Sequence, residues 1–222
     1  AIVMAGIKAK AFPGCQVLIA KDGAVIYNRS FGTFEYDGKE VVTNDAIYDL
    51  ASMSKATATL PAIMKLYDKK EFSLNDPISK YVQAFKNTDK SGITIREALL
   101  HESRLPSFIP YYMNAIDTGS YSGKLLSARR DAQHTVQYDT DTWVRTDYQF
   151  KPQIISSYSK EGFTPLADNL YISKAYHDTI IKAIADSKLL KRKQYMYSCL
   201  DSIMLQPVME RIAKTNNLQP TD

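Results

Sequence analysis

Two short β-prone runs joined by an Asp-Gly pair restrict the fold of this chain more than any other feature of its sequence. Residues 15–20 and 24–31 are rich in apolar and β-branched side chains, and Asp22-Gly23 lies between them. An Asp-Gly pair between two such runs favours the tight turn of a β-hairpin. Because the open edge of an apolar hairpin pairs readily with other strands, we expect this hairpin to belong to a larger antiparallel sheet.

Helical spacing of apolar residues follows the hairpin. Residues 52–68 (SMSKATATLPAIMKLYD) carry apolar side chains three and four positions apart, which predicts a mostly buried helix. Pro61 falls inside this helix and lacks a backbone donor, so we expect a kink or a locally repaired turn there. Thr94, with Glu97 three residues later, predicts the capped start of a short helix. Residues 203–214 predict a final amphipathic helix.

The chain as a whole has the composition of an ordinary globular domain. Of its 222 residues, 45% are hydrophobic and 23% are charged, which allows a substantial core. Between about residues 107 and 190 the pattern loosens into Tyr, Ser, Thr and Asp, and a helical period returns only near residue 175. We therefore expect a single domain over residues 1–222, in which residues 107–190 form an inserted, partly irregular helical region.

Charge and hydropathy argue against several classes of protein. The net charge is +4, and the basic residues are spread along the chain apart from the run 191–193, which argues against a nucleic-acid partner. No stretch of the sequence reaches the roughly 18 apolar residues that a membrane span needs. The isolated histidines and distant cysteines give no metal-ligand spacing, and no glycine-rich phosphate loop is present. We therefore expect no metal and no organic cofactor.

Ser52 and Lys55 form an S-x-x-K pattern where an irregular segment, residues 47–51, gives way to a helix. Positions i and i+3 share one helix face, so the hydroxyl and the amine come within hydrogen-bond reach, and the helix N-terminus favours an oxyanion. A lysine accepts the proton of a serine nucleophile only if the pKa of the lysine is lowered. The alternative is a chance pattern in which Ser52 caps the helix and Lys55 is solvated, and nothing local separates Ser52 from Ser54.

Several further motifs occur in a fixed order around this pattern. They are Pro13-Gly14, the Asp22-Gly23 hairpin, Gly32, residues 47–55 (IYDLASMSK), residues 74–81 (LNDPISKY) and residues 93–106 (ITIREALLHESRLP). With these motifs the first half of the chain resembles the serine β-lactamase and D,D-peptidase (penicillin-binding) family of the class C type. The resemblance implies an α/β fold of the α+β kind, with an antiparallel sheet flanked by helices and a helical subdomain. It also implies a serine hydrolase with Ser52 as nucleophile and Lys55 as its partner base.

The resemblance resumes at residues 195–199 (YMYSC), which look like the family's Y-x-N element. In the family this tyrosine lies opposite the serine and exchanges protons with it, so Tyr197 is the candidate general base or acid. The alternative for Tyr197 is packing, because the chain has 15 tyrosines. Cys199 stands where the family has Asn or Asp, so the candidate substrate-binding position carries a thiol in place of an amide or carboxylate.

Two further departures from the family pattern bear on activity. Arg104 replaces the glycine of the H-x-S-G-L-P stretch and puts a bulky charge at a turn, while His101 of that stretch is retained and is expected to be structural. The family's third motif, Lys-Thr-Gly or His-x-Gly on a strand, is missing, because residues 214–216 follow a helix and lack the glycine. We therefore expect that C-terminal strands are missing and that a longer protein or a second chain completes the sheet.

The reaction that the resemblance implies is acyl transfer through an acyl-enzyme. The family's substrates are β-lactams, D-Ala-D-Ala cell-wall peptides and small esters, and the sequence leaves the choice open. The alternative is a catalytically silent domain used for binding or as an accessory to a cell-wall glycosidase, for which Cys199, Arg104 and the missing third motif argue.

The resemblance also carries an expectation about the location of the protein. Members of the family are exported bacterial proteins of the periplasm or cell envelope, and some are fused behind a β-N-acetylhexosaminidase domain. If that arrangement applies here, Ala1 is a cut inside a longer cell-wall-recycling protein.

Overall fold

The computed structural model describes residues 1–139 and 141–216 and divides into two compact units. The first unit holds residues 1–50 and 126–144, and the second holds the remaining described residues. Both units combine helices with antiparallel strands, which confirms the predicted mixed α/β class. The single-domain organisation over residues 1–222 stays a prediction.

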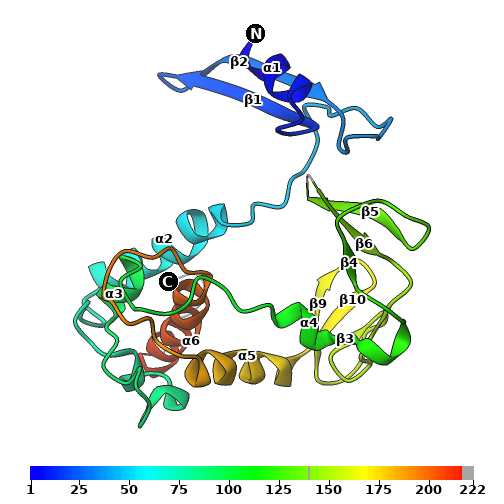
Figure 1. Cartoon of the computed structure of the whole chain (residues 1–222). Coiled ribbons are helices and arrows are strands. Elements are labelled where there is room, and N and C mark those ends of the chain that lie inside the picture. The colour runs from blue at the N-terminus through cyan, green and yellow to red at the C-terminus, as the bar shows by residue number, and fades with distance from the viewer. Residues whose placement is uncertain (140, 217–222) are drawn as a thin grey trace. The chain divides into compact units, whose positions relative to one another are not determined.

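The first unit opens with the expected hairpin, drawn in blue in Figure 1. α1 (Ile2–Lys8) precedes β1 (Gly14–Lys21) and β2 (Ala24–Gly32), and the two strands pair antiparallel from end to end. Asp22 and Gly23 form the turn with φ of +51° and +79°, the two positive values that a type I′ turn needs. The structure therefore confirms the hairpin, and most side chains of β2 are exposed.

A three-stranded sheet is the other element of the first unit. β4 (Leu126–Ser127), β6 (Thr142–Arg145) and β5 (His134–Asp139) form it in that order. Before β5, the Asp131 carboxylate accepts a hydrogen bond of 2.8 Å from the backbone N–H of His134 and lies 2.9 Å from His134 Nδ1. The backbone bond and the imidazole together lower the pKa of Asp131 to about 2.

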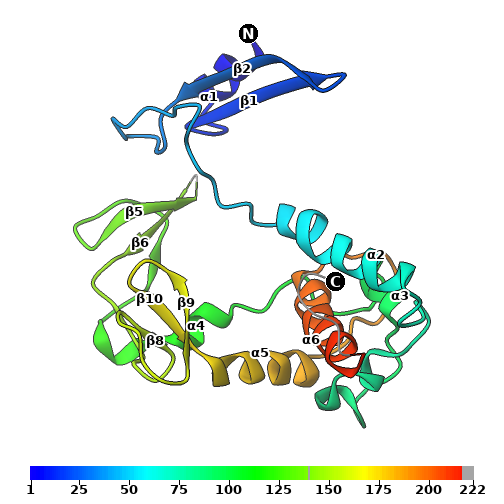
Figure 2. The ribbon, with the colours of Figure 1, turned by 180° about the vertical axis from the view of Figure 1, so that it is seen from behind.

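Helices form the core of the second unit. The π-helical turn η1 (Lys55–Thr59) continues into α2 (Leu60–Asp68), and both contact the C-terminal helix α6 (Cys199–Thr215). α3 (Ile95–Leu99) and α5 (Lys174–Asp186) also contact α6, which Figures 1 and 2 show from opposite sides. α6 is therefore the element around which this unit packs.

The core cluster of the second unit is apolar. Phe85, Ile184 and Met204 come from three different segments, and each is 0% exposed. The other buried side chains of the cluster are Ile63, Ile78, Val82, Ile93, Ile95, Ala98, Leu105, Ile181, Ala185, Leu200, Leu205, Val208 and Ile212. The final helix predicted over residues 203–214 forms, and its buried members supply much of this cluster despite Pro207.

The helix predicted over residues 52–68 forms in part, but the expectation that it is mostly buried is wrong. Ile63 packs into the core, whereas Met64 is 61% exposed, because only one face of α2 meets α6. Pro61 lies in the first turn of α2, and the repair expected there takes the form of η1, in which the Leu60 N–H donates to the Lys55 carbonyl five residues back.

Residues 107–190 differ from the helical region that the sequence predicts. Helices α4 (Tyr111–Ala115) and α5 flank a series of short strands. In the second unit these strands are β3 (Ile116–Asp117), β7 (Gln149–Phe150), β8 (Ile155–Ser156), β9 (Phe163–Ala167) and β10 (Leu170–Ser173). β3 pairs with β7, and the other sheet has the order β8-β10-β9. β3, β7 and β8 have two residues each, too few to show an alternating pattern in the sequence.

Short 3₁₀ turns and one capped helix complete the described secondary structure. The turns are η2 (Ile78–Lys80), η3 (Gln83–Phe85) and η4 (Thr118–Ser120). The predicted cap of α3 is confirmed, because Thr94 Oγ1 accepts a hydrogen bond from the Glu97 N–H at 3.1 Å while the Glu97 carboxylate accepts one from the Thr94 N–H at 2.8 Å.

Candidate active site

The side chains of Ser52, Lys55, Tyr197 and Cys199 converge in the second unit. The Tyr197 hydroxyl donates a hydrogen bond of 2.7 Å to Ser52 Oγ, and Lys55 Nζ donates one of 3.3 Å to the same oxygen. Lys55 Nζ also lies 3.6 Å from Cys199 Sγ and 5.2 Å from the centre of the Tyr197 ring. The structure thus brings together all four residues that the sequence singled out.

A sharp backbone turn presents Ser52 at the start of the helical segment. Ala51, directly before it, has a φ of +43°, a region that residues other than glycine rarely occupy. The Lys55 N–H donates to the Ser52 carbonyl at 3.1 Å, so the two residues share one helical turn. Their side chains therefore lie on one face, as the spacing predicts.

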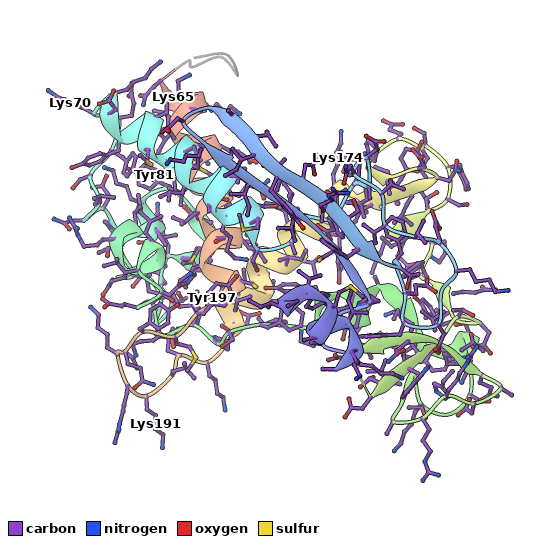
Figure 3. All side chains as sticks on the ribbon, turned by 90° about the horizontal axis from the view of Figure 1, so that it is seen from above. Lys65, Lys70, Tyr81, Lys174, Lys191 and Tyr197 are labelled. Atoms are coloured by element: carbon purple, nitrogen blue, oxygen red, sulfur yellow. The ribbon has the colours of Figure 1, made fainter. Side chains whose placement is uncertain are left out.

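Tyr197 lies on an irregular segment, residues 187–198, just before α6 (Figure 3). A second segment, residues 101–107, holds it through three backbone hydrogen bonds. These bonds run from the N–H groups of Leu190, Met196 and Cys199 to the carbonyls of Arg104, His101 and Ser107, at 2.7, 2.8 and 2.9 Å. Figure 3 also shows Lys191 extending outward from the same segment. We call residues 101–107 the clamp segment, because it fixes the path of the chain on both sides of Tyr197.

Arg104 keeps the backbone shape of the glycine that the family pattern has at this position. Its φ is +68°, and that of His101 three residues earlier is +54°. A left-handed conformation of this kind costs about 1–2 kcal/mol for a residue with a Cβ. The Arg104 side chain partly offsets that strain, because its Nε donates a 2.7 Å hydrogen bond to the Leu190 carbonyl. The bulky charge at this turn thus strengthens the clamp.

The pKa of Lys55 is raised, contrary to the lowered value that a lysine base requires. Partial burial lowers this pKa, but the hydrogen bond to Tyr197 and the charges that Cys199 and Tyr197 can carry raise it by more. This direction favours the ammonium form of Lys55 over the neutral form that a general base requires. As an ammonium group, Lys55 donates to Ser52 and favours negative charge on the oxygens around it.

Two ionisable groups beside the site were not found from the sequence. Asp201, in the first turn of α6, is 0% exposed, and a 2.8 Å hydrogen bond joins its Oδ2 to His101 Nδ1. Burial raises the pKa of Asp201, although Ser103 and His101 pull it down in part. Burial and the neighbouring Cys199 raise the pKa of Tyr111 to about 12, so this hydroxyl keeps its proton. A single Asp or Tyr has no spacing pattern that would have marked either one.

A groove of about 520 Å³ borders the site within the second unit. Its walls come from η1, α2 and α6 and include Ala62, Ile203 and Met209, while Lys55 and Cys199 lie along it. Since Ala62, Ile203 and Met209 form an apolar part of its wall, the groove offers room for an apolar part of a ligand beside a polar pair.

No three His, Cys, Asp or Glu side chains of residues 1–139 and 141–216 come together as a metal site requires. None of the helices in the same part of the chain is long and apolar enough to cross a bilayer. Residues 214–216, which lack the glycine of the family's third motif, lie at and just after the end of α6 and form no strand.

Residues 1–218 match a protein family described as Beta-lactamase. Protein flp of Staphylococcus aureus (strain MRSA252) is 29% identical over 171 residues, which are 75% of this chain and 34% of that protein. The N-acetylmuramyl-L-alanine amidase of Bacillus subtilis (strain 168) is 30% identical over 154 residues, which are 64% of this chain and 33% of that protein. The chain thus spans about a third of the length of these curated relatives.

Solved structures show the same fold. The octameric penicillin-binding protein homologue from Pyrococcus abyssi superposes with a TM-score of 0.57 at 20% identity, over 96% of this chain and 38% of that one. EstCE1, a hydrolase with promiscuous acyltransferase activity, superposes with a TM-score of 0.55 at 20% identity, over 96% of this chain and 45% of that one. The likeness confirms the predicted β-lactamase/transpeptidase-like fold.

Proposed function

Because the chain belongs to the β-lactamase family, we propose that it acts as a serine hydrolase with Ser52 as its nucleophile. The observation that carries the proposal is the meeting of two groups that can exchange protons at one oxygen: the Tyr197 hydroxyl lies 2.7 Å from Ser52 Oγ, and Lys55 Nζ lies 3.3 Å from it. A serine hydroxyl needs one neighbour to accept its proton and gains from a second that stabilises the resulting charge. We assign the first task, accepting the proton, to Tyr197 and the second, stabilising the charge, to Lys55.

In the proposed reaction Tyr197 first gives its hydroxyl proton to water and then, as the phenolate, takes the Ser52 proton while Ser52 Oγ bonds to the carbonyl carbon of an ester or amide. The Lys55 ammonium stabilises the phenolate beforehand and the serine oxygen as its proton leaves. The backbone N–H of Ser52 donates to the oxyanion that forms. Tyr197 then returns the proton to the leaving group as the bond to the carbonyl carbon breaks, which leaves the acyl group on Ser52 as an ester.

Release of the acyl group repeats these steps with a new nucleophile. Water or an acceptor amine gives its proton to Tyr197 and bonds to the acyl carbon. The bond to Ser52 Oγ then breaks, and Tyr197 returns the proton to the serine. No electron transfer and no metal enter this cycle. Cys199 is proposed to border the bound substrate, since its sulfur lies 3.6 Å from Lys55 Nζ.

The proposed substrates are esters or amides of the classes that the family accepts: β-lactams, D-Ala-D-Ala cell-wall peptides and small esters. The name of the amidase relative supports a cell-wall peptide, and the description of EstCE1 as a hydrolase with promiscuous acyltransferase activity supports acyl transfer. The apolar groove beside Lys55 and Cys199 favours an acyl group with an apolar part. We further propose that the protein is exported to the periplasm or cell envelope, where such peptides occur, and that a second chain or further segment supplies the rest of the sheet.

Mass spectrometry of the intact protein after exposure to an activated fluorophosphonate or a reporter penicillin tests the proposed function. We expect one adduct on the parent protein and none on Ser52→Ala. Ser54→Ala is the matched control, because it removes a serine from the same turn and is expected to be labelled like the parent. Labelling of Ser52→Ala, or equal loss in both serine variants, would rule out Ser52 as the nucleophile.

The second candidate function is a catalytically silent domain that binds a ligand or serves a cell-wall glycosidase. The thiol of Cys199 favours it, because the family pattern has an amide or a carboxylate at that position. In a binding experiment the protein is fixed to a column and a cell-wall peptide is passed over it. Retention of the peptide, together with no adduct from either probe, would support this function over hydrolysis.

A further inference from the structure

Behind Tyr197 lies a chain of contacts that ends in a buried acid. The His101 ring packs against the Tyr197 ring with 4.8 Å between ring centres, and it also contacts Tyr195 edge to face at 6.0 Å. On its other side, His101 Nδ1 lies 2.8 Å from Asp201 Oδ2. The imidazole thus stands between a buried carboxyl group and the tyrosine that reaches Ser52.

The backbone around His101 ties the same groups together. The His101 carbonyl accepts a hydrogen bond from the Met196 N–H at 2.8 Å, and its Nδ1 lies 3.3 Å from the Ser198 backbone nitrogen. Met196 and Ser198 are the two residues that flank Tyr197. His101 therefore contacts Tyr197 through its ring and both chain neighbours of Tyr197 through polar atoms, which leaves the tyrosine little freedom to turn away.

Asp201 is suited to hold this ring and unsuited to a direct part in the reaction. Its side chain is 1% exposed, and among the described residues no hydrogen bond or ring contact joins it to Tyr197 or Ser52. A carboxyl group buried in this way is retained at a free-energy cost unless its hydrogen bonds compensate. The bond to His101 is the contact through which Asp201 can act on the site.

We infer that His101 and Asp201 are positioning residues: Asp201 holds the His101 ring, and the ring holds the Tyr197 hydroxyl against Ser52. The inference rests on the proposed function and deepens it, because it gives the retained His101 a task in acylation. It is compatible with the expectation that His101 is structural, since His101 takes no direct part in the reaction.

A double-mutant cycle on labelling of Ser52 by the fluorophosphonate tests the inference. We expect His101→Ala to lower the maximal labelling rate about tenfold in the parent, since small displacements of reacting groups carry penalties of this size or more, and to leave the half-saturating probe concentration unchanged. In a Tyr197→Phe background, in which there is no hydroxyl left to position, the same change should cost less than twofold. Equal losses in the two backgrounds would overturn the inference.

Conservative variants distinguish a loss of positioning from a loss of folding. Asp201→Asn retains the shape and a hydrogen-bonding oxygen, so we expect it to recover most of the rate that Asp201→Ala loses. His134→Ala is the matched control, because His134 also pairs with an aspartate but belongs to the first unit. An Asp201→Asn variant as slow as Asp201→Ala, with both fully folded by circular dichroism, would count against the positioning role.

Tyrosine labelled with ¹³C at Cζ separates this inference from the proposed function. If the parent is never acylated, the proposed function fails, and the NMR signal of Tyr197 still reports on its surroundings. We expect that signal, assigned through Tyr197→Phe, to shift in Asp201→Ala and to stay in place in His134→Ala. A Tyr197 signal unmoved by Asp201→Ala would refute the inference whether or not the protein is an enzyme.

Discussion

The side-chain oxygens of Tyr197 and Ser52 lie 2.7 Å apart, although 145 positions separate the two residues in the chain. Ser52 comes just before η1, Tyr197 comes just before α6, and η1 packs against α6. The distance between the two oxygens therefore depends on how these helical elements pack, which connects the chemistry of the site to the core behind it.

Truncation of a core methionine should destabilise the second unit strongly. Met204 of α6 is 0% exposed, so Met204→Ala removes buried methylene groups and leaves a cavity. We expect a loss of about 2–5 kcal/mol in the free energy of unfolding, measured by urea denaturation. Met64→Ala is the matched control, because Met64 is 61% exposed, and it should change stability by at most about 0.5 kcal/mol. Equal losses in the two variants would contradict this packing.

Substitutions at Arg104 should separate two contributions to the stability of the fold: the strain of its backbone and the hydrogen bond of its side chain. Both Arg104→Ala and Arg104→Gly lose the 2.7 Å bond to the Leu190 carbonyl, but only the glycine relieves the strain of a φ of +68°. We expect the glycine variant to be more stable than the alanine variant by about 1 kcal/mol. Thermal unfolding of the two proteins measures the difference, and an alanine variant as stable as the glycine variant would show that the turn is unstrained.

Acid should lower the stability of the first unit within a defined range of pH. The pKa of Asp131 is about 2 in the folded chain and 3.8 ordinarily, so folding favours its ionised form. That contribution to stability is fully present above about pH 4 and is lost as the pH falls through about 2. Trp143, the single tryptophan of the chain, lies in β6 and reports on this unit by fluorescence. We expect Asp131→Asn to lose less stability than the parent between pH 4 and pH 2, and an identical loss would disprove the assignment.

Restoring an amide at residue 199 should speed acylation. The Cys199 sulfur is a weak acceptor 3.6 Å from the Lys55 ammonium, whereas an amide oxygen accepts a stronger, charge-assisted bond. If that bond adds about 1.4 kcal/mol to stabilisation of the transition state, Cys199→Asn raises the labelling rate roughly tenfold. Cys199→Ala, which offers no acceptor, should show no rise. A rise in both variants would mean that the thiol obstructs the site by its size.

Local features of the fold were predictable wherever a few neighbouring residues decide them. Asp22-Gly23 suits the positive φ values of a hairpin turn, and Thr94 with Glu97 caps a helix in any surroundings. The spacing of Ser52 and Lys55 likewise sufficed to predict that their side chains meet, because helix geometry alone requires it.

Features that depend on contacts between distant segments were not predictable. The clamp segment joins residues 187–198 through backbone groups, which every residue carries and which leave no mark in the sequence. The direction of the Lys55 pKa shift was not predictable for a related reason. Burial lowers this pKa, the neighbouring Tyr197 and Cys199 raise it, and the spacing of residues in the sequence gives neither the burial nor the distances. Asp201 was missed because its importance comes from its burial beside His101.

The widened turn η1 sets the rotation of the site relative to the core. A π-helical turn holds one residue more than an α-helical turn, and each residue advances an α-helix by about 100°. Because the wide turn accommodates one residue more than an α-helical turn, the number of residues between Lys55 and Leu60 is part of what fixes the direction of Ser52 and Lys55 relative to Ile63. The length of this short stretch, more than its composition, thus determines whether the serine faces Tyr197, and we expect it to tolerate substitutions far better than insertions or deletions.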